Sequence, residues 1–460
     1  MLLERFLALV ERSFQHVYRR PASRKRAAEH ALGFLLTLGR RTIARVICTL
    51  GRKDRSDWSA EYKLYSRSPW NPADAFDVVI EERLARGPDG PIAVAIDDTR
   101  LPRTGPAVFG ARWTYDPLSP PFHINLMWGL RMLHASLLFP HYRESHGVPC
   151  RGVPVRFELV PSVRKPGKKA GAEDHAQYRA AIKKQNLSIQ AVQMAAELRA
   201  RLDQHGAPER PLIIAGDGSF CNRTVFRSDL PRVIWLSRAR RNSRLCFPAP
   251  PDSRRIYDRQ SFTPEDLRKD DRTPWQPVSV FYGGQYREIR YKEHKGVYWQ
   301  HGSARRPLRV LVLAPQPYYH GPGGKTWYRA AAYLFCTDLE LSAGLLLQSY
   351  LDRWQIEVNH REMKDIYGVG DAQVRNEQSV KRHPAFAVAA YSTLLIAAMQ
   401  AFGARWSPEL FELPKWRKRT PNRPSAYDLL ARLRRELYES TQLADDLAEI
   451  RDNLPLYAYG

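Results

Sequence analysis

The sequence predicts an α/β protein with a mixed central sheet flanked by helices, a helical N-terminal domain and a β-rich insertion. Between residues 86 and 234, short apolar runs bounded by turn residues, typical of buried strands, occur together with a long helical pattern. The first 85 residues and those after Leu339 show helical periodicity, whereas residues 235–330 lose it. With 460 residues the chain is long enough for two or three domains.

Residues 1–85 are expected to form a basic helical domain. Between Arg5 and Arg55 there are 13 Lys and Arg against three Asp and Glu. A run of charge is often only a solvated helix face, but an excess this one-sided also suits a surface that contacts DNA. We therefore expect DNA binding here, and the segment SRSPWNPADAF then begins a linker helix.

Residues 86–234 are expected to form the first part of the α/β core. The runs PIAVAIDDT, GLRMLHASLLFP, VPVRFELVP and PLIIAGDGSF predict strands, and a helix is predicted from Asp174 to Gln204. Asp97 and Asp98 follow one apolar run and Asp217 follows another. Acids at strand ends can share a divalent ion through oxygen ligands, although a single Asp there is more often a turn or helix cap.

Residues 235–330 are expected to form a basic, all-β insertion. This segment has 19 Lys and Arg against 8 Asp and Glu, interleaved with Tyr and Trp. Basic groups that pair with phosphates, beside aromatic rings that stack on bases, suit a nucleic-acid surface. We expect Trp299 to stack on a base displaced from the duplex. The alternative is a core Trp, because Tyr298 and Trp299 point to opposite faces of a strand and one of them must point inward.

Residues 331–404 are expected to complete the core, with a single long helix, AGLLLQSYLDRWQIEVNHREMKDIYG, that carries a third acid. At about 100° per residue, one narrow stripe of this helix holds four polar residues, Tyr350, Arg353, Glu357 and Lys364. It borders the apolar face predicted to pack on the sheet, which includes Leu347, Leu351, Trp354 and Val358. Glu362 lies roughly opposite the stripe, which favours Glu357 as the working carboxylate.

The spacing of this stripe resembles the Y-R-E-K signature of bacterial insertion-sequence DDE transposases. Two residues separate Tyr350 from Arg353, three separate Arg353 from Glu357, and six separate Glu357 from Lys364. The segments IDDT at Asp97 and GDGS at Asp217 resemble the same group, as does a β-rich insertion before the Glu. The resemblance extends from about residue 90 to residue 400, and SRSPWNPADAF more weakly resembles one branch of the group.

The resemblance implies a ribonuclease H-like core in which Asp97, Asp217 and Glu357 hold two Mg²⁺ ions, or Mn²⁺ in their place. In such enzymes the first acid is commonly followed by any residue and then Thr or Ser, which favours Asp97 over Asp98. The Tyr, Arg and Lys of the signature contact the DNA backbone near the cut end, so Tyr350, Arg353 and Lys364 are expected to position phosphates.

A transposase function is what the resemblance implies. The enzyme would bind double-stranded DNA at terminal inverted repeats, cleave it with metal ions and transfer the strand to target DNA, as a dimer assembled on DNA. It would act in the bacterial cytoplasm and join the nucleoid when bound to DNA. Two alternatives remain open, a related nuclease without strand transfer and a non-catalytic DNA-binding descendant of a transposase.

The charge, the apolar segments and the cysteines limit the other function classes. The 72 Lys and Arg exceed the 48 Asp and Glu by 24, and nucleic acid is the first candidate for the anionic partner. A basic membrane-associated protein is a further alternative, but the uncharged stretch 384–404 is Ala-rich and contains polar residues, which favours a buried core helix. Five widely spaced cysteines predict neither disulfides nor a zinc site. Residues 405–460 are expected to form a helical C-terminal region.

Overall fold

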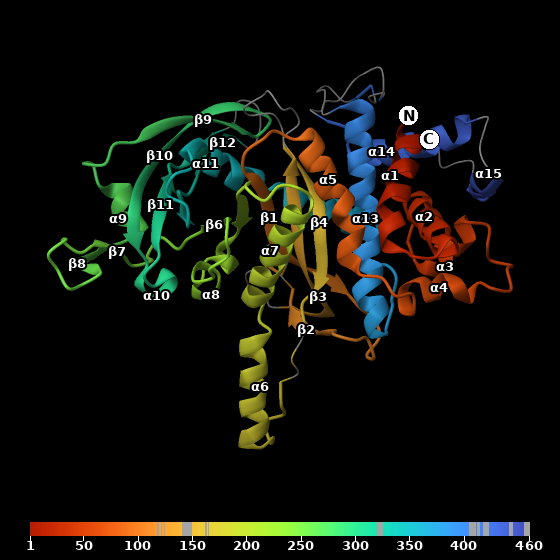
Figure 1. Ribbon diagram of the computed structural model, residues 1–460, viewed down its shortest axis with the longest axis horizontal. Coiled ribbons are helices and arrows are strands. Elements are labelled where there is room, and N and C mark those ends of the chain that lie inside the picture. The colour runs from red at the N-terminus through yellow and green to blue at the C-terminus, as the bar shows by residue number, and fades with distance from the viewer. Residues whose placement is uncertain are drawn as a thin grey trace.

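The computed structural model describes residues 1–116, 119–120, 122–123, 125–139, 150–161, 163, 165–319, 325–403, 411, 415–416, 423–440 and 445–454. Figure 1 shows a twisted sheet in the middle of the molecule, with the first and last helices gathered on one side and the insertion on the other. This arrangement confirms the mixed α/β architecture, whereas the predicted domain boundaries remain predictions.

The chain begins with helices that pack on a helix from its C-terminal part. They are α1 (Leu2–Val17), α2 (Pro21–Leu36), α3 (Ile43–Thr49), α4 (Ser59–Ser66), the 3-10 helix η1 (Pro72–Phe76) and α5 (Asp77–Arg86). The apolar face of α1 contacts α13 (Glu377–Phe402), and the rings of Phe14 and Phe386 stack with their centroids 5.6 Å apart. The N-terminal helices therefore share one hydrophobic core with the rest of the chain.

Five strands form the centre of the sheet in the order β4-β3-β1-β5-β6. The first three along the chain, β1 (Ile92–Pro102), β3 (Leu126–Phe139) and β4 (Arg151–Leu159), pair antiparallel. The next two, β5 (Leu212–Gly216) and β6 (Val233–Arg238), run parallel to β1. The short strand β2 (Arg112–Tyr115) pairs with the beginning of β3 and forms an edge of the sheet.

The strand that carries the first candidate acid is longer than predicted. Parallel pairing between β1 and β5 ends at Ile96, opposite Gly216, as the apolar run suggested. The strand nevertheless continues through Asp97 and Asp98 to Pro102, because the antiparallel pairing with β3 persists to the same residue. The prediction that Asp97 follows the end of its strand is therefore wrong. Asp97 lies within β1, at the point where the pairing with β5 stops and the pairing with β3 continues.

The helix predicted from 174 to 204 is two helices, α6 (Ala172–Lys184) and α7 (Leu187–Gln204). The break occurs at Asn186, whose side chain caps α7 by accepting a hydrogen bond from the Ile189 amide at 3.0 Å. None of the residues of α6 is buried, and Figure 1 shows this helix projecting from the body of the molecule. The 3-10 helix η2 (Gly218–Phe220) and the short α8 (Arg223–Phe226) follow β5.

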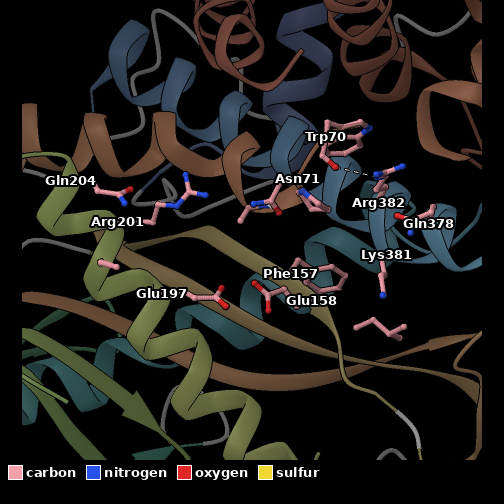
Figure 2. Close-up of a pocket in the computed structure, with 14 residues that line it drawn as sticks. Trp70, Asn71, Phe157, Glu158, Glu197, Arg201, Gln204, Gln378, Lys381 and Arg382 are labelled. Carbon is pink, nitrogen blue, oxygen red and sulfur yellow. Dashed lines mark hydrogen bonds between the residues drawn. The ribbon is translucent and has the colours of Figure 1, made fainter. Parts of the chain in front are cut away.

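A cavity of about 550 Å³ lies between the linker segment, β4, α7 and α13. Trp70 and Asn71 of the segment SRSPWNPADAF line it, and Figure 2 shows Glu158 and Glu197 facing each other across it. Burial, and then the charge of Glu197, raise the pKa of Glu158 to about 7. The cavity contains none of the predicted catalytic acids.

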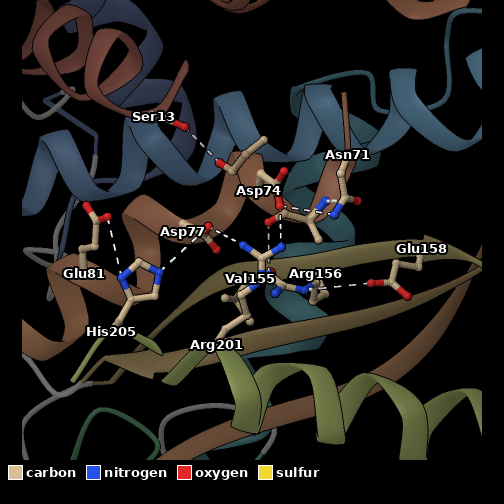
Figure 3. A network of polar contacts seen from close by, with 12 residues as sticks. Ser13, Asn71, Asp74, Asp77, Glu81, Val155, Arg156, Glu158, Arg201 and His205 are labelled. Carbon is tan, nitrogen blue, oxygen red and sulfur yellow. Dashed lines mark hydrogen bonds and ion pairs between the residues drawn. The ribbon is translucent and has the colours of Figure 1, made fainter. Parts of the chain in front are cut away.

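A polar network beside this cavity joins the N-terminal helices to the core (Figure 3). Arg201 of α7 pairs with Asp77 of α5 at 2.5 Å and also with Asp74 of η1. His205 lies 3.9 Å from Asp77 and 3.8 Å from Glu81. These contacts connect the end of α7 to η1 and α5.

The insertion is β-rich and continues the central sheet. Its elements are β7 (Leu245–Pro248), β8 (Tyr257–Phe262), α9 (Pro264–Lys269), β9 (Gln276–Tyr282), β10 (Gln285–Tyr298), α10 (Gln300–Ser303), β11 (Pro307–Leu313), β12 (Gln316–Tyr319) and β13 (Thr326–Arg329). The helices α9 and α10 show that the all-β prediction is wrong. After the insertion, β14 (Ala332–Cys336) pairs with both β6 and β11, so the backbone hydrogen bonds of the sheet run on into β10 and β7.

The remaining described elements are helical: α11 (Ala343–Asp352), α12 (Gln355–Arg361), the π-helix η3 (Glu362–Ile366), α13, α14 (Ala426–Glu439) and α15 (Asp445–Asp452). Within the described residues, α13 is the one helix long and apolar enough to cross a membrane, and 78% of its apolar stretch is buried. It packs on α1, α2, α4 and β4 and behaves as the predicted core helix. The five cysteines are free, as predicted.

Candidate active site

Asp97 and Asp217 follow directly after two paired strand segments. Since β1 and β5 run parallel and pair as far as Ile96 and Gly216, the next residue of each strand lies at the same edge. Burial, and then the charge of Asp217, raise the pKa of Asp97 to about 7. Two carboxylates held together in this way repel each other, and a cation between them would remove that repulsion.

Asp217 is also a helix cap. Its carboxylate accepts hydrogen bonds from the Ser219 amide at 2.8 Å and from the Ser219 hydroxyl at 3.3 Å, at the start of η2. The cap interpretation and the catalytic interpretation are therefore compatible, because the capping carboxylate also acts electrostatically on Asp97.

Asp98 has a different environment from its neighbour. Arg131 donates two hydrogen bonds to its carboxylate, both at 2.9 Å, and Arg100 donates a third. Burial acts to raise the pKa of Asp98, but the hydrogen bonds and charges of the two arginines lower it below the ordinary value. Successive residues of a strand point to opposite faces, so Asp98 points away from the side of Asp97. Asp98 is engaged in ion pairs, which supports Asp97 as the metal ligand.

The helix predicted to carry Glu357 as one straight element is broken twice. A tight turn at Arg353 and Trp354 separates α11 from α12, and there the Glu357 amide donates to the Trp354 carbonyl at 3.1 Å. The π-helix η3 then follows α12 directly. The breaks allow α11 to pack on β5, β6 and β9 while α12 packs on β1, β3 and β4, which a straight helix on a twisted sheet could not do.

These breaks change which residues of the helix are buried. Trp354, predicted to pack on the sheet, is 58% exposed, and Ile356 and Asn359 are buried in α12 instead. Glu362 is buried, and it accepts a hydrogen bond from the Tyr391 hydroxyl at 2.5 Å. Its carboxylate is thus held against α13.

Three of the four stripe residues interact electrostatically with the two Asp residues, Arg353 and Lys364 with Asp97 and Tyr350 with Asp217. Arg353 pairs with Glu357 at 2.9 Å, and the charge of Arg353 acts on Asp97. Burial raises the pKa of Tyr350, with Asp217 and Glu357 among the smaller causes. Burial lowers the pKa of Lys364, and the charge of Asp97 opposes this shift.

The three predicted acids do not form a closed metal site. In the described part of the chain, no group of three His, Cys, Asp or Glu side chains could hold a metal ion. The charges of Asp97 and Asp217 interact, whereas the carboxylate of Glu357 is bound by Arg353. The site therefore consists of a carboxylate pair and a third carboxylate engaged with a cation on its own helix.

Comparison with protein families identifies the enzyme class. The family described as DDE superfamily endonuclease matches residues 13–306 of the chain. The chain belongs to this family. The DDE endonuclease match includes Asp97 and Asp217 and ends before the Y-R-E-K residues. No curated protein matches the chain.

Family membership confirms the coarse predictions. The protein is a DDE transposase-like enzyme that acts on DNA, and the superfamily generally uses divalent metal ions.

In this DDE endonuclease, Trp299 packs against other aromatic side chains. Its ring lies 5.2 Å from that of Phe335 and 5.8 Å from that of Phe226, measured between centroids. It also covers Gly302, where an added Cβ would come within 2.0 Å of the ring. These contacts favour the alternative in which Trp299 is a core residue.

A buried polar network behind the DDE endonuclease site was not predicted. Asn359 of α12 donates to the Gly152 carbonyl and to the Tyr391 hydroxyl, each at 3.0 Å, and accepts from the Ser136 hydroxyl at 2.8 Å. The network ties α12 to β3, β4 and α13, and so fixes the helix that carries Glu357. No motif in the sequence marks these residues, because their hydrogen-bond partners lie on elements far apart in the chain.

Proposed function

We propose that this DDE superfamily endonuclease is a DNA transposase that cleaves double-stranded DNA at terminal inverted repeats and joins the freed 3′-hydroxyl to target DNA. The observation that carries the proposal is the carboxylate pair Asp97 and Asp217 at one edge of parallel strands, with the pKa of Asp97 raised to about 7. Such a pair is a cation site before any cation binds.

The finer fold proposed is ribonuclease H-like. Its support is the order β4-β3-β1-β5-β6, in which three antiparallel strands are followed by two strands parallel to the first. Asp97 lies on the first of these strands in chain order, and Asp217 directly follows the fourth. The helix that would supply the third acid packs across the same strands.

Asp97, Asp217 and Glu357 are proposed to hold two Mg²⁺ ions, or Mn²⁺. The first two fit this role because they supply the carboxylate oxygens that Mg²⁺ prefers and follow paired positions of two parallel strands. Glu357 fits once its carboxylate leaves Arg353. When bound, the metal supplies Lewis-acid stabilisation of the phosphate and makes a water or a 3′-hydroxyl more acidic.

Arg353 offers a simple means of releasing Glu357. The two side chains form an (i, i+4) pair on a helical turn, and Glu357 is 34% exposed, so the pair stabilises the protein by only about 0.3–0.5 kcal/mol. A DNA phosphate makes charge-assisted, often bidentate hydrogen bonds to a guanidinium and can compete with the single hydrogen bond from Arg353 to Glu357. Binding of the DNA end would therefore transfer Arg353 from Glu357 to the phosphate, beside Tyr350 and Lys364 as further phosphate-positioning residues.

The N-terminal region is proposed to extend this DNA surface. Lys364 lines a cavity of about 470 Å³ together with Arg40, which follows α2, and Arg434 of α14. These cations from three separate segments suit a phosphate backbone. Because two DNA ends must be cut and joined together, a dimer assembled on DNA is proposed, acting in the bacterial cytoplasm at the nucleoid.

The test uses DNA that flanks the coding region. The protein is incubated with Mg²⁺, labelled duplexes carrying these ends and a supercoiled target plasmid. A transposase yields end cleavage and labelled plasmid joined through a 3′-hydroxyl, whereas a related nuclease yields cleavage alone. Asp97→Asn, Asp217→Asn and Glu357→Gln should each abolish cleavage while the affinity for the ends stays within about tenfold, because carboxylates repel phosphates. Absence of joined plasmid from reactions that cleave would refute the transposase proposal.

A further inference from the structure

Helix α6 buries none of its 13 residues, and Figure 1 shows it projecting beyond the sheet below α7. Isolated helices of this length are only marginally stable in water, and most helices in proteins are held by an apolar face packed on a core. Since α6 has no such face in the described part of the chain, nearly all of its surface is available to a partner.

The C-terminal end of α6 lies beside the candidate active site. Two residues after it, Asn186 caps α7, and Ser188 in the first turn of α7 accepts a hydrogen bond from the Asn222 side chain at 2.8 Å. The same amide group donates to the Ser219 carbonyl at 2.8 Å, and the Ser219 amide donates to the Asp217 carboxylate at 2.8 Å. These contacts connect the base of α6 to the edge of the sheet that carries Asp217.

Cations dominate α6 and the segment before it, residues 165–184, which we call the arm. The arm contains six Lys and Arg against two acids. Both acids, Glu173 and Asp174, lie in the first turn of α6, where they offset the positive end of the helix dipole. Lys183 and Lys184 lie in the last turn, at the end nearer the active site. The arm is therefore most positive where it joins the catalytic edge.

The cations of α6 have no partner in the protein itself. Arg179, Lys183 and Lys184 are exposed, and their side chains form no ion pair or hydrogen bond within the described residues. Tyr178 and Ala181 are half-buried against the loop that precedes the helix. At about 100° per residue, Arg179 and Lys183 lie on the opposite side of the helix from these two. Both cations therefore face solvent, away from the rest of the arm.

We propose that the arm binds duplex DNA beside the site of cleavage, with Arg179, Lys183 and Lys184 on backbone phosphates. At about 1.5 Å per residue, α6 is about 20 Å long and reaches along about six base pairs. The proposal rests on the proposed function, because the DNA that the arm holds is the DNA that enters the active site.

Duplex DNA is the occupant that the chemistry of the arm fits. Unpaired cations select a polyanion, and a duplex carries one phosphate charge per about 1.7 Å of its axis. A second copy of the chain, or another protein, would need a stripe of large apolar residues on which to dock. The large apolar side chains of α6 are Tyr178 and Ile182, and Tyr178 packs against the loop.

The test measures binding alone, in EDTA, so that cleavage has no part in it. Fluorescence anisotropy gives the affinity of the full chain for a labelled duplex of about thirty base pairs between 50 and 200 mM salt. Each phosphate contact contributes about 0.9 to the slope of log affinity against log salt, so Arg179→Gln/Lys183→Gln should lower this slope by about 1.8. The variant should therefore lose about tenfold less affinity than the wild type over this range. Its melting temperature should not change, because neither side chain is buried.

Arg86→Gln/Arg435→Gln is the matched control. It also removes two cations, whose side chains are 57% and 55% exposed and which lie outside the arm. It should leave the salt slope unchanged. If the arm variant lowers the melting temperature, Lys168→Gln/Lys169→Gln replaces it, since both of these lysines are exposed in the arm before α6, and it should lower the slope in the same way.

An unchanged salt slope in the arm variant, or an equal loss of slope in the control, would overturn the arm proposal. Sedimentation without DNA tests the other occupant. A wild-type dimer that becomes a monomer in the arm variant, with the salt slope unchanged, would assign the arm to a second copy of the chain.

The proposed function fails separately. A salt slope that depends on the arm, in a protein that never cleaves end DNA with Mg²⁺, supports the arm and refutes the transposase. Cleavage and joining by a protein whose salt slope is indifferent to Arg179 and Lys183 refute the arm alone.

Discussion

Substitutions of the adjacent acids Asp97 and Asp98 should have opposite effects: the first stabilises the protein and abolishes cleavage, and the second destabilises it and leaves cleavage largely intact. Asp97→Asn should stabilise the protein at pH 8 and abolish cleavage. The pKa of Asp97 is about 7, against an ordinary 3.8, and about 1.36 kcal/mol per pH unit gives an upper limit of about 4 kcal/mol for the cost of ionising it in the folded state. Because burying the polar Asn amide also has a desolvation cost, we expect a gain of about 2 kcal/mol.

The sign follows from proton binding. Between pH 3.8 and pH 7 the folded state holds more protons on Asp97 than the unfolded state does, so stability falls as pH rises through this window. The Asn variant therefore gains nothing below pH 3.8 and most above pH 7. The gain should disappear when wild-type protein is saturated with Mg²⁺, because the metal stabilises the ionised carboxylate.

Asp98→Asn should have the reverse effect. Asp98 is 13% exposed, and its removal leaves Arg131 and Arg100 without their shared anion. Breaking a fully buried pair costs about 3–5 kcal/mol, and partial exposure here reduces this to about 2 kcal/mol. Cleavage should remain within about tenfold of wild type, because the metal ligands are intact.

Urea unfolding at pH 8 and pH 4 measures the stability of both variants. End cleavage in Mg²⁺ measures their activity. The reasoning is refuted if Asp98→Asn abolishes cleavage without loss of stability, which would make Asp98 the ligand. A destabilised Asp97→Asn variant would contradict the electrostatic argument even if that variant did not cleave.

Three further substitutions test other parts of the site and the fold. Arg353→Gln should raise the affinity for Mn²⁺ without DNA by about 2- to 10-fold, because Glu357 loses its partner, and should weaken binding of the DNA end. Unchanged Mn²⁺ affinity in calorimetry would contradict the proposal that Arg353 moves from Glu357 to a DNA phosphate. Glu158→Gln should stabilise the protein by about 1 kcal/mol at pH 8, after allowance for the third of this side chain that is exposed. The same variant should show no gain at pH 4, because the raised pKa of Glu158 leaves it protonated there, and a gain of equal size at both pH values would exclude titration as the cause. Trp299→Ala should lower the free energy of unfolding by about 3 kcal/mol and should cleave duplex DNA and DNA unpaired at its end equally well. Unchanged stability, with a cleavage defect on duplex DNA that the unpaired end relieves, would instead support the base-stacking role.

The sequence predicted the central strands well because their apolar runs are local signals. PIAVAI and PLIIAG became β1 and β5, and their pairing places Asp97 and Asp217 together. The extension of β1 to Pro102 depends on β3, a partner more than 20 residues away. The continuation of the sheet into the insertion depends in the same way on β14, whose pairing no local pattern reveals.

The helix that carries Glu357 shows where a helical wheel ceases to hold. The wheel assumes a constant rotation per residue, and the turn at Arg353 and the π-helix after Arg361 change it. Trp354 is consequently exposed although the wheel placed it on the sheet. The roles of Arg131 and Arg100 had no signal in the sequence, because they follow from the register of β1 against β3.

The packing of α1 on α13 affects how the chain is made in the cell. From Val17 at the end of α1 to Glu377 at the start of α13 is 360 residues. At about 5–20 residues per second, α1 leaves the ribosome roughly 20–70 s before the helix that covers it. The part of its apolar face that α13 covers, which includes Phe14, is exposed to other nascent chains throughout this interval. Expression should therefore benefit from chaperones or low temperature, and fragments that end before residue 377 should aggregate.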